Sequence, residues 1–379
     1  MKFCESRCWA EIDLDVLKNN LDVIKNHVGN KTKLIAVVKA DAYGHGAVAI
    51  SEFCEEYGVD CFAVACESEG IELRKAGIKK PILLLSYVSS QSIPDIVKYD
   101  LTTTVYDYEY ADKLNEYLVS QNKSAKVHIK LDTGMSRLGF NTDDIDMAAE
   151  EIEKIYKLSN IKIEGIYTHY ADSDNIDTQF CNEQFERYTK VIDRLCKMGI
   201  NIPIKHTCNS AGVMAHKEKY LDAVRCGIML YGYYPEDFLK ESMPGLKPVL
   251  SWKARLSQIK VVNEDITVSY GRVGSLKKGS KTGVVSVGYA DGYSRGLSDS
   301  FYVLINGKKA PVIGRVCMDQ LIVDLSHIEG VKKEDVVTLI GEENNEKISA
   351  DDMAKKLDTI SYEVLCNVSK RVERVYIKR

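Results

Sequence analysis

The sequence predicts an α/β protein in which a (β/α)8 TIM barrel is followed by a mostly β C-terminal domain. In residues 1–245, eight short apolar runs rich in β-branched residues alternate with segments of helical spacing. After the segment MPGLKP at 243–248, the pattern changes to short runs punctuated by glycine. A length of 379 residues is also long for a single hydrophobic core. We therefore expect one domain over 1–243 and a second over 244–379.

The eight runs are apolar on both faces, as the strands of a buried parallel sheet must be. Eight strand-helix units in about 250 residues match the count and length of a closed barrel. An open, doubly wound sheet is the alternative architecture for these units. The runs span 33–40, 61–66, 81–86, 101–106, 126–133, 161–169, 202–210 and 222–230, and helical segments between them include 109–121 and 184–199.

Hairpin signals replace helical spacing in the second domain. One helix is expected near 348–358, before a closing strand at the C-terminus. A further strand, at about 8–14, precedes the barrel and is a candidate to pair with the second domain instead. The expected strands of this domain lie within 249–262, 283–290, 301–307, 310–325 and 335–341.

Charge and hydropathy exclude several classes of function. Fifty-one basic and fifty-five acidic side chains give a net charge of −4, so no long-range positive field attracts nucleic acid or an anionic membrane. The longest apolar stretches are far shorter than the roughly 20 residues that span a bilayer. Residues 1–15 mix charge into every turn and do not resemble a signal peptide, so we expect a cytoplasmic protein.

Cysteine and histidine spacing predicts neither a disulfide framework nor a metal site. The chain has eleven cysteines, an odd number, without a C-x-x-C pair, so reduced thiols are expected. Its seven histidines show no paired ligand spacing, and we therefore expect no metal.

The active site of a (β/α)8 barrel lies at the carboxyl ends of its strands, so the residues that end each run are the candidates for chemistry. The first run ends at Lys39. Apolar neighbours around its stem would desolvate the amine and lower its pKa, which makes Lys39 a candidate to form a Schiff base. The alternative is an ordinary strand-end lysine whose amine extends into solvent.

The glycines that follow Lys39 permit a rival interpretation. Residues 44–49 fit the pattern G-x-G-x-x-A, and Glu67 lies 21 residues after Gly46, which nominally matches a dinucleotide-binding fingerprint. In that fingerprint the first glycine follows the strand directly, whereas here five residues intervene. A dehydrogenase is therefore the weaker hypothesis.

Other strand ends carry cationic and small polar residues. Ser210 opens the helix after the seventh run, and Gly227 allows close backbone approach after the eighth, where barrels commonly bind phosphate. Ser210 is also explained as an ordinary helix N-cap. A Schiff-base lysine and a phosphate site on one barrel rim together indicate pyridoxal 5′-phosphate. The remaining candidates on this rim are Lys130, Arg137, His169, Asn209 and Arg225.

Nine segments resemble, in order, the motifs of bacterial alanine racemase, a fold-type III enzyme that depends on pyridoxal phosphate. The resemblance covers nearly the whole chain, and nine ordered motifs make it highly specific. The segments are 39–46, 128–140, 168–174, 206–211, 225–232, 268–271, 287–295, 314–320 and 360–366.

This resemblance implies an isomerase that interconverts L- and D-alanine by two-base proton transfer on a pyridoxal phosphate aldimine of Lys39. Tyr270 would be the opposing base and would come from the partner subunit, so a homodimer with shared active sites is implied. Met318, also from the partner, would bind the substrate carboxylate through its backbone N–H. The usual destination of D-alanine in this family is cell-wall peptidoglycan.

The resemblance also implies roles for the other residues. The cofactor's phosphate would be held by Tyr43, Ser210, Tyr362 and the backbone of Gly227 and Ile228, with Asn209 beside them. Arg225 would meet the pyridine nitrogen, His169 would bridge towards Tyr270, and Arg137 would meet the phenolic oxygen and the substrate. Lys130 is similar to a lysine that is often carbamylated in the family and then orients Arg137.

Alternative functions share parts of this interpretation. Tyr362 beside the pocket favours alanine over a larger substrate, but a racemase of another small amino acid, such as serine, remains an alternative. A pyridoxal phosphate decarboxylase would need an acid facing the ring nitrogen, where this chain offers Arg225. A non-catalytic pyridoxal phosphate carrier would need only the barrel.

Overall fold

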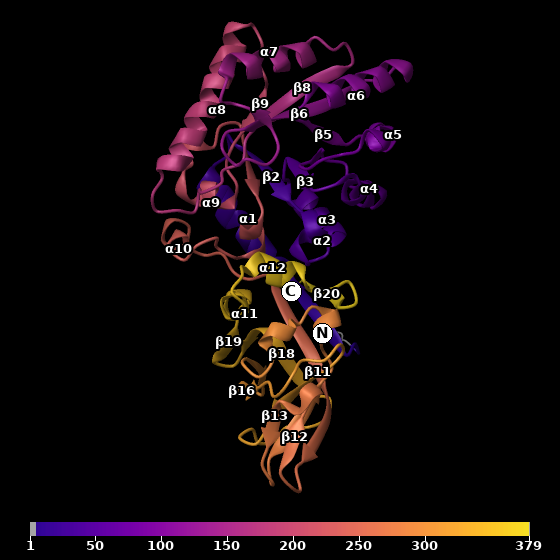
Figure 1. Ribbon diagram of the computed structural model, residues 1–379, viewed down its shortest axis with the longest axis vertical. Helices are drawn as coiled ribbons and strands as arrows, with labels where there is room; N and C mark the ends of the chain where they lie inside the picture. Colours follow the sequence, from indigo (N-terminus) through magenta and orange to yellow (C-terminus); the bar gives the residue numbers. More distant parts are fainter. Residues whose placement is uncertain (1–4, 379) are drawn as a thin grey trace. The chain divides into compact units, whose positions relative to one another are not determined.

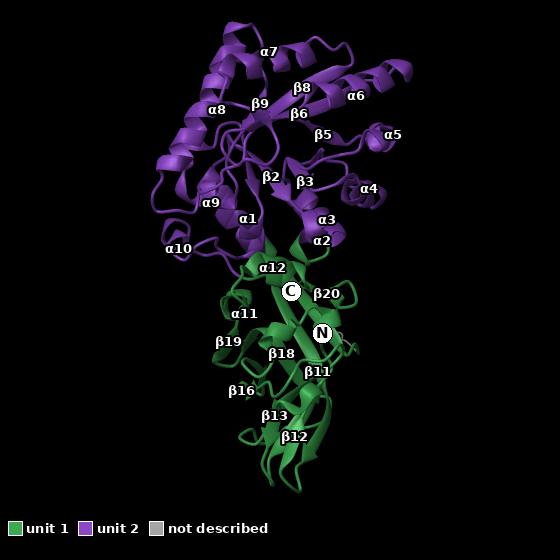
Figure 2. Cartoon of the chain, viewed as in Figure 1, with its two compact units in different colours: residues 1–17, 43–46, 248–379 green, residues 18–42, 47–247 purple. Residues whose placement is uncertain are grey.

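The computed structural model describes residues 5–378, which form two compact units (Figure 2). The barrel unit consists of residues 18–42 and 47–247. Of the described residues, 5–17, 43–46 and 248–378 form the β unit. No helix within 5–378 is both long and apolar enough to cross a membrane.

Eight parallel strands of the barrel unit form a closed barrel. Their order is β5-β4-β3-β2-β10-β9-β8-β6, and a further pairing between β5 and β6 closes the sheet, so the open-sheet alternative is wrong. Each of the eight predicted runs contributes one strand. The bounds are β2 (Lys33–Val37), β3 (Cys61–Val64), β4 (Ile82–Leu84), β5 (Thr102–Val105), β6 (Ala125–Asp132), β8 (Ile161–Tyr167), β9 (Ile204–His206) and β10 (Ala223–Cys226), with the short β7 (Phe140–Asn141) beside β6.

Helices surround this barrel (Figure 1). They pack on it through apolar faces, as α8 does with Tyr188, Val191 and Leu195, all buried. Asp107 and Asp144 cap α6 and α7 by accepting hydrogen bonds from backbone N–H groups of the first turn. The helices are α1 (Leu14–Val28), α3 (Ala47–Tyr57), α4 (Glu67–Lys75), α5 (Ile93–Lys98), α6 (Tyr108–Ser120), α7 (Ile145–Tyr156), α8 (Gln179–Lys197), α9 (Ser210–Ala215) and α10 (Leu239–Ser242).

The β unit is built on one long strand, β11 (Leu250–Val261), which pairs with β1, β14 and β18. A predicted helix near 348–358 is present as α11, and a second short helix, α12, follows it. The remaining elements are β12 (Ile266–Val268), β13 (Gly274–Leu276), β14 (Lys281–Val285), β15 (Tyr302–Ile305), β16 (Lys308–Pro311), β17 (Leu321–Asp324), β18 (Val336–Glu343), β19 (Glu346–Ile348), α11 (Ala350–Leu357), α12 (Ser361–Cys366) and β20 (Glu373–Ile377).

The N-terminal strand β1 (Cys8–Asp13) belongs to the β unit. It pairs antiparallel with β11 and parallel with β20. A closed barrel has no unpaired edge at which another strand could add, whereas the open sheet of the β unit does. The unit boundary after the barrel lies at residue 247, a few residues beyond the expected 243.

Residues 43–46 also pack within the β unit, which explains the two glycines of the G-x-G pattern. Gly44 has φ +81°, and a Cβ there would lie 2.2 Å from the Leu365 carbonyl oxygen. A Cβ on Gly46 would collide with the Tyr376 hydroxyl. The Gly44 carbonyl accepts hydrogen bonds from Nε and Nη2 of Arg374, at 3.0 and 2.9 Å. These glycines therefore serve close packing against the C-terminal segment, with no need for a dinucleotide.

Candidate active site

Lys39 lies at the carboxyl end of β2, in a turn of unusual backbone conformation. The turn α2 (Lys39–Tyr43) contains Ala40, Asp41 and Ala42 at φ 53–54°, and Tyr43 also has φ 53°. Left-handed backbone costs a non-glycine residue roughly 1–2 kcal/mol, so four in succession need support from their surroundings.

Hydrogen bonds supply that support. The Ala40 N–H donates to Oε1 of Glu69 at 2.7 Å, and Oδ1 of Asp41 accepts from the Ala47 N–H at 2.8 Å. The Ala42 N–H donates to the Val38 carbonyl at 2.9 Å. The backbone around Lys39 is thus fixed from both sides, which is typical of a residue with a geometric task.

Arg225, on β10, is a buried cation held by neutral acceptors. Its guanidinium donates to the carbonyls of Thr168 and Thr207 at 2.7 and 2.8 Å, and lies 5.1 Å from the ring centre of Tyr167. It also donates to Nδ1 of His206 at 2.8 Å. No carboxylate is among the hydrogen-bond partners that the structure gives Arg225. An arginine stays protonated even when buried, so a fixed positive charge lies here.

Two histidines beside Arg225 are held neutral. Burial, followed by the Arg225 charge, lowers the pKa of His169 and of His206 well below the usual value. Arg225 donates to Nδ1 of both, at 3.3 Å for His169, so each ring accepts at Nδ1 and carries its proton on Nε2. The Nε2–H of His206 then donates to Nδ1 of His128, 3.0 Å away.

Lys130 completes a group of cations at this end of the barrel. Its side chain is buried, and its Nζ lies 5.6 Å from the ring centre of Tyr167. Burial and the nearby charges of Arg137, Arg225 and Lys39 lower the pKa of Lys130 to about 8, while Asp132 acts in the opposite direction. Three positive charges and one negative charge thus act on Lys130, and this excess of positive charge favours an anionic ligand.

The seventh and eighth strands place a small polar cradle next to these cations. The Gly227 N–H donates to the Ser210 hydroxyl at 3.0 Å. Asn209, not Ser210, is the N-cap of α9, since its Oδ1 accepts from the Gly212 N–H at 2.9 Å. The N-cap explanation of Ser210 is therefore wrong. Ile228 follows Gly227 and is buried.

The structure therefore gathers nine of the candidate residues at the carboxyl ends of the barrel strands. Sequence analysis assigned no role to Tyr167, whose ring stacks on His206 with centroids 4.8 Å apart and lies beside both Arg225 and Lys130. The register shift between β6 and β8 interrupts the alternation of side chains along β8, so strict period two would not have marked Tyr167 as inward-facing. The nine are Lys39, Lys130, Arg137, His169, Asn209, Ser210, Arg225, Gly227 and Ile228.

Four candidates lie in the β unit. The rings of Tyr43 and Tyr362 are 6.1 Å apart and tilted, and burial raises the pKa of Tyr43. Tyr270 and Met318 share a surface pocket of about 520 Å³ with Ser269, Cys317, Asp319 and Gln320. Tyr270 is 69% exposed and Met318 is 52% exposed, which is unusual for large apolar residues.

Comparison with known proteins gives consistent matches over the whole chain. Residues 12–235 match the family model described as "Alanine racemase, N-terminal domain", and residues 249–376 match "Alanine racemase, C-terminal domain". A protein named alanine racemase from Methanococcus maripaludis is 46% identical over 369 residues, covering 97% of this chain and 98% of its own.

Solved structures agree. A structure of alanine racemase from Clostridium difficile has a TM-score of 0.95 at 41% identity, covering 99% of this chain and 97% of that one. Another, titled as alanine racemase from Bartonella henselae with covalently bound pyridoxal phosphate, has a TM-score of 0.86 at 27% identity, covering 98% of this chain and 100% of that one.

Proposed function

The chain belongs to the alanine racemase family, and from this membership we propose that it interconverts L-alanine and D-alanine with pyridoxal 5′-phosphate. The observation that carries the proposal is the buried Arg225 with only neutral acceptors, among the cations around Lys39. This arrangement gives a chemical reason for the activity that the family matches over residues 12–235 and 249–376 indicate.

The residues at the barrel mouth fit this cofactor. Arg137, Arg225 and Lys39 act as positive charges on Lys130, whereas Asp132 acts as a negative one, and a phosphate with a phenolic oxygen would balance this excess of positive charge. We infer that Lys39 holds the aldehyde carbon, Arg225 the pyridine nitrogen and Arg137 the phenolic oxygen. The phosphate would be held by Tyr43, Asn209, Ser210, Tyr362 and the backbone of Gly227 and Ile228.

When bound, pyridoxal phosphate withdraws electron density from the amino acid and makes its Cα proton acidic. Racemisation then requires one group to remove this proton from one face and another to deliver a proton to the opposite face. We assign the amine of Lys39 to one face and the phenol of Tyr270 to the other. Neutral His169, with its proton on Nε2, can donate a hydrogen bond that stabilises the Tyr270 phenolate.

We propose that Tyr270 and Met318 act in the active site of a second copy of the chain, in a homodimer. Their exposure in the β unit supports this assignment, because large apolar side chains on a surface commonly mark an interface. The Met318 N–H has no hydrogen-bond acceptor within residues 5–378, so it is available to a substrate carboxylate.

The remaining elements of the proposal concern the cell. We propose a cytoplasmic enzyme that supplies D-alanine for peptidoglycan.

Decarboxylation is the less favoured chemistry, since Arg225 opposes protonation of the ring nitrogen and decarboxylation needs the strong electron sink that a protonated ring provides. We propose that Tyr362 borders the substrate pocket and favours alanine over serine.

The test combines a cofactor assay with a product assay. We expect absorbance near about 420 nm that borohydride abolishes, and formation of D-alanine from L-alanine. Tyr270→Phe should keep the absorbance and lose most racemisation, whereas Lys39→Ala should lose both. Purified protein that carries the cofactor but forms no D-alanine would contradict the proposed function. Equal turnover of serine would contradict the substrate assignment alone.

A further inference from the structure

An acidic side chain borders the pocket that contains Tyr270 and Met318. Asp319 follows Met318 directly, lines the same pocket, and its side chain is 53% exposed. A carboxylate next to a backbone N–H that is to bind another carboxylate weakens binding, because like charges repel. The β unit therefore needs a cation that compensates Asp319.

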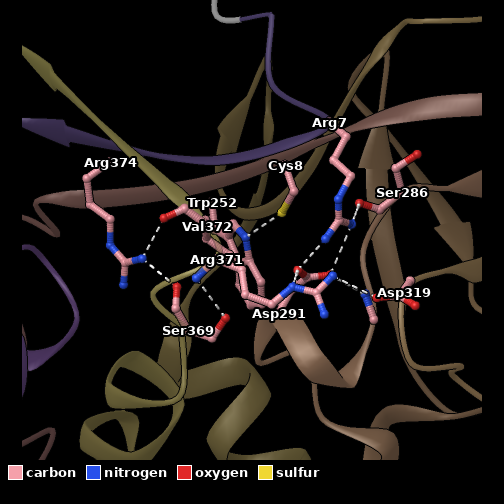
Figure 3. A network of polar contacts seen from close by, with 11 residues as sticks. Arg7, Cys8, Trp252, Ser286, Asp291, Asp319, Ser369, Arg371, Val372 and Arg374 are labelled. Atoms are coloured by element: carbon pink, nitrogen blue, oxygen red, sulfur yellow. Dashed lines mark hydrogen bonds and ion pairs between the residues drawn. The ribbon is translucent and has the colours of Figure 1, made fainter.

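Arg371 is that cation (Figure 3). Its Nη2 lies 2.7 Å from Oδ1 of Asp319, and its Nε lies 3.3 Å from Oδ1 of Asp291. Asp291 is fully buried and also pairs with Arg7, at 2.6 and 3.2 Å. The two arginines and two aspartates cancel in charge, so the network brings no net charge to the pocket.

Asp291 connects Arg371 to the backbone of residues 317–320, which we call the Met318 turn and in which the Cys317 N–H donates to the Gln320 carbonyl at 2.9 Å. Its Oδ2 accepts from the Gly288 N–H at 3.0 Å. The next two N–H groups, of Tyr289 and Ala290, donate to the carbonyls of Cys317 and Met318, each at 3.0 Å. A Cβ on Gly288 would lie 2.3 Å from both carbonyl oxygens, so the two segments are in closest contact here. Arg371 thus fixes the turn through Asp319 on one side and Asp291 on the other.

The segment that carries Arg371 is itself braced. Nη1 of Arg374 donates to the carbonyls of Ser369 and Val372 at 2.5 and 2.6 Å, and Nη2 donates to the Val368 carbonyl at 2.6 Å. Figure 3 shows the contacts of Arg374 with Ser369 and Val372, together with the Asp291 pairs. The Arg371 side chain therefore extends from a rigid base.

The Arg371–Asp319 pair is poorly suited to a role in folding. Both side chains are close to half exposed, and exposed ion pairs contribute little to stability. The pair should instead affect ligand binding in the pocket that Asp319 borders.

We propose that Arg371 is a positioning residue of the racemase. It pairs with Asp319 and Asp291, and so lets the Met318 turn present its N–H, without an opposing charge, to the carboxylate of the amino-acid substrate. This inference rests on the proposed function.

The test measures KM and kcat for alanine in the holoenzyme. Arg371→Gln leaves Asp319 uncompensated, so we expect KM to rise about fivefold with kcat little changed. The rise should shrink at high ionic strength, because salt screens an exposed charge. The double variant Arg371→Gln with Asp319→Asn removes the opposing charge and should restore KM.

Arg194→Gln is the matched control. Arg194 pairs with Asp146 at 2.5 Å on the barrel unit and has a similar exposure, so its loss should leave KM unchanged. Asp319→Asn alone keeps the buried pairs of Asp291 and should lower KM below the wild-type value, which keeps the test informative if Arg371→Gln folds poorly.

Failure of this inference is distinguishable from failure of the proposed function. Wild-type protein that does not racemise alanine contradicts the function. If wild-type protein racemises alanine, three results would overturn the role of Arg371. The first is a wild-type KM in Arg371→Gln, and the second is a KM that stays raised in the double variant. The third is a raised KM in Asp319→Asn alone.

Discussion

Arg225 is the residue whose surroundings say most about the chemistry. It is buried, its hydrogen-bond acceptors are carbonyls and neutral imidazoles, and it lies over the ring of Tyr167. If the proposed cofactor places its pyridine nitrogen beside Arg225, the fixed cation would oppose protonation of that nitrogen, whereas an acid would favour it. In the proposed racemisation, a weakened electron sink would favour prompt return of a proton to Cα over side reactions.

Replacing Arg225 by Glu should therefore raise side reactions. We expect more pyruvate from transamination per racemisation event, because a protonated ring stabilises the carbanion for longer. The measurement is pyruvate release during turnover of L-alanine. Arg225→Lys, which keeps the charge, is the control. An unchanged ratio of pyruvate to D-alanine in Arg225→Glu would contradict the assigned role.

Lys130 is the second informative residue, since its pKa is lowered to about 8. Carbon dioxide reacts with a neutral amine and not with an ammonium, so this lysine is suited to carbamylation near neutral pH. The resulting carbamate would be an anion among Arg137, Arg225 and Lys39, where negative charge is favoured.

We expect a carbamate signal in ¹³C NMR spectra of protein incubated with labelled bicarbonate. At fixed dissolved carbon dioxide, the signal should weaken as the pH falls below about 8, because the pKa of Lys130 lies there and the amine becomes protonated. Lys130→Ala should lack the signal, and Lys126→Ala, on the same strand, should retain it. A signal that survives Lys130→Ala would assign the carbamate elsewhere.

Among the elements, β6 and β8 show how strand packing positions the buried polar groups. His128 on β6 pairs in register with Gly165 on β8. A Cβ on Gly165 would lie 2.4 Å from the His128 ring, so only glycine leaves room for the imidazole that receives the Nε2–H of His206. The register shift between Val127 and His128 lies next to this contact.

Gly165→Ala should therefore destabilise the barrel unit. Overpacking of a dense core costs about 1–3 kcal/mol, and the His128–His206 hydrogen bond would be strained as well. Thermal denaturation measures the effect. Gly29→Ala is the control, since its Cβ would meet nothing within 4 Å and carries only the cost of its φ of +84°. A melting temperature that falls no further in Gly165→Ala than in Gly29→Ala would contradict this account of the packing.

At the scale of the whole molecule, the proposed function divides one active site between two copies of the chain. Lys39 lies in the barrel unit, and Tyr270 lies exposed in the β unit. In a dimer with shared sites, each site combines Lys39 of one subunit with Tyr270 of the other.

Complementation between inactive variants tests this arrangement. A mixed dimer of Lys39→Ala and Tyr270→Phe subunits should contain one site with both residues intact and one site with neither. Random co-assembly should therefore recover about a quarter of wild-type activity. Each variant assembled alone is the control. If each site were built from a single subunit, the mixture would be as inactive as its parents.

Prediction from the sequence succeeded where the signal is local. The eight barrel strands were predicted because each is a short apolar run, buried on both faces and separated from the next by a helix. Lys39, Lys130, His169 and Arg225 were predicted to lie at one rim because strand ends meet there in a barrel, and the structure places them at the carboxyl ends of their strands, while their roles stay predictions. Tyr167 and the Asp291 network were missed, since nothing in their immediate neighbours marks their partners.

The amino-acid sequence alone thus determined the barrel, its eight strands and the family, because apolar periodicity and ordered motifs are properties of short segments. Only the tertiary structure decided that residues 8–13 and 43–46 pack with the C-terminal β unit, and that Arg371 lies between two aspartates. Such contacts join segments far apart in the chain. They depend on which strand edges and charged groups remain unpaired once the local elements have formed. The periodicity of a short segment does not contain this information.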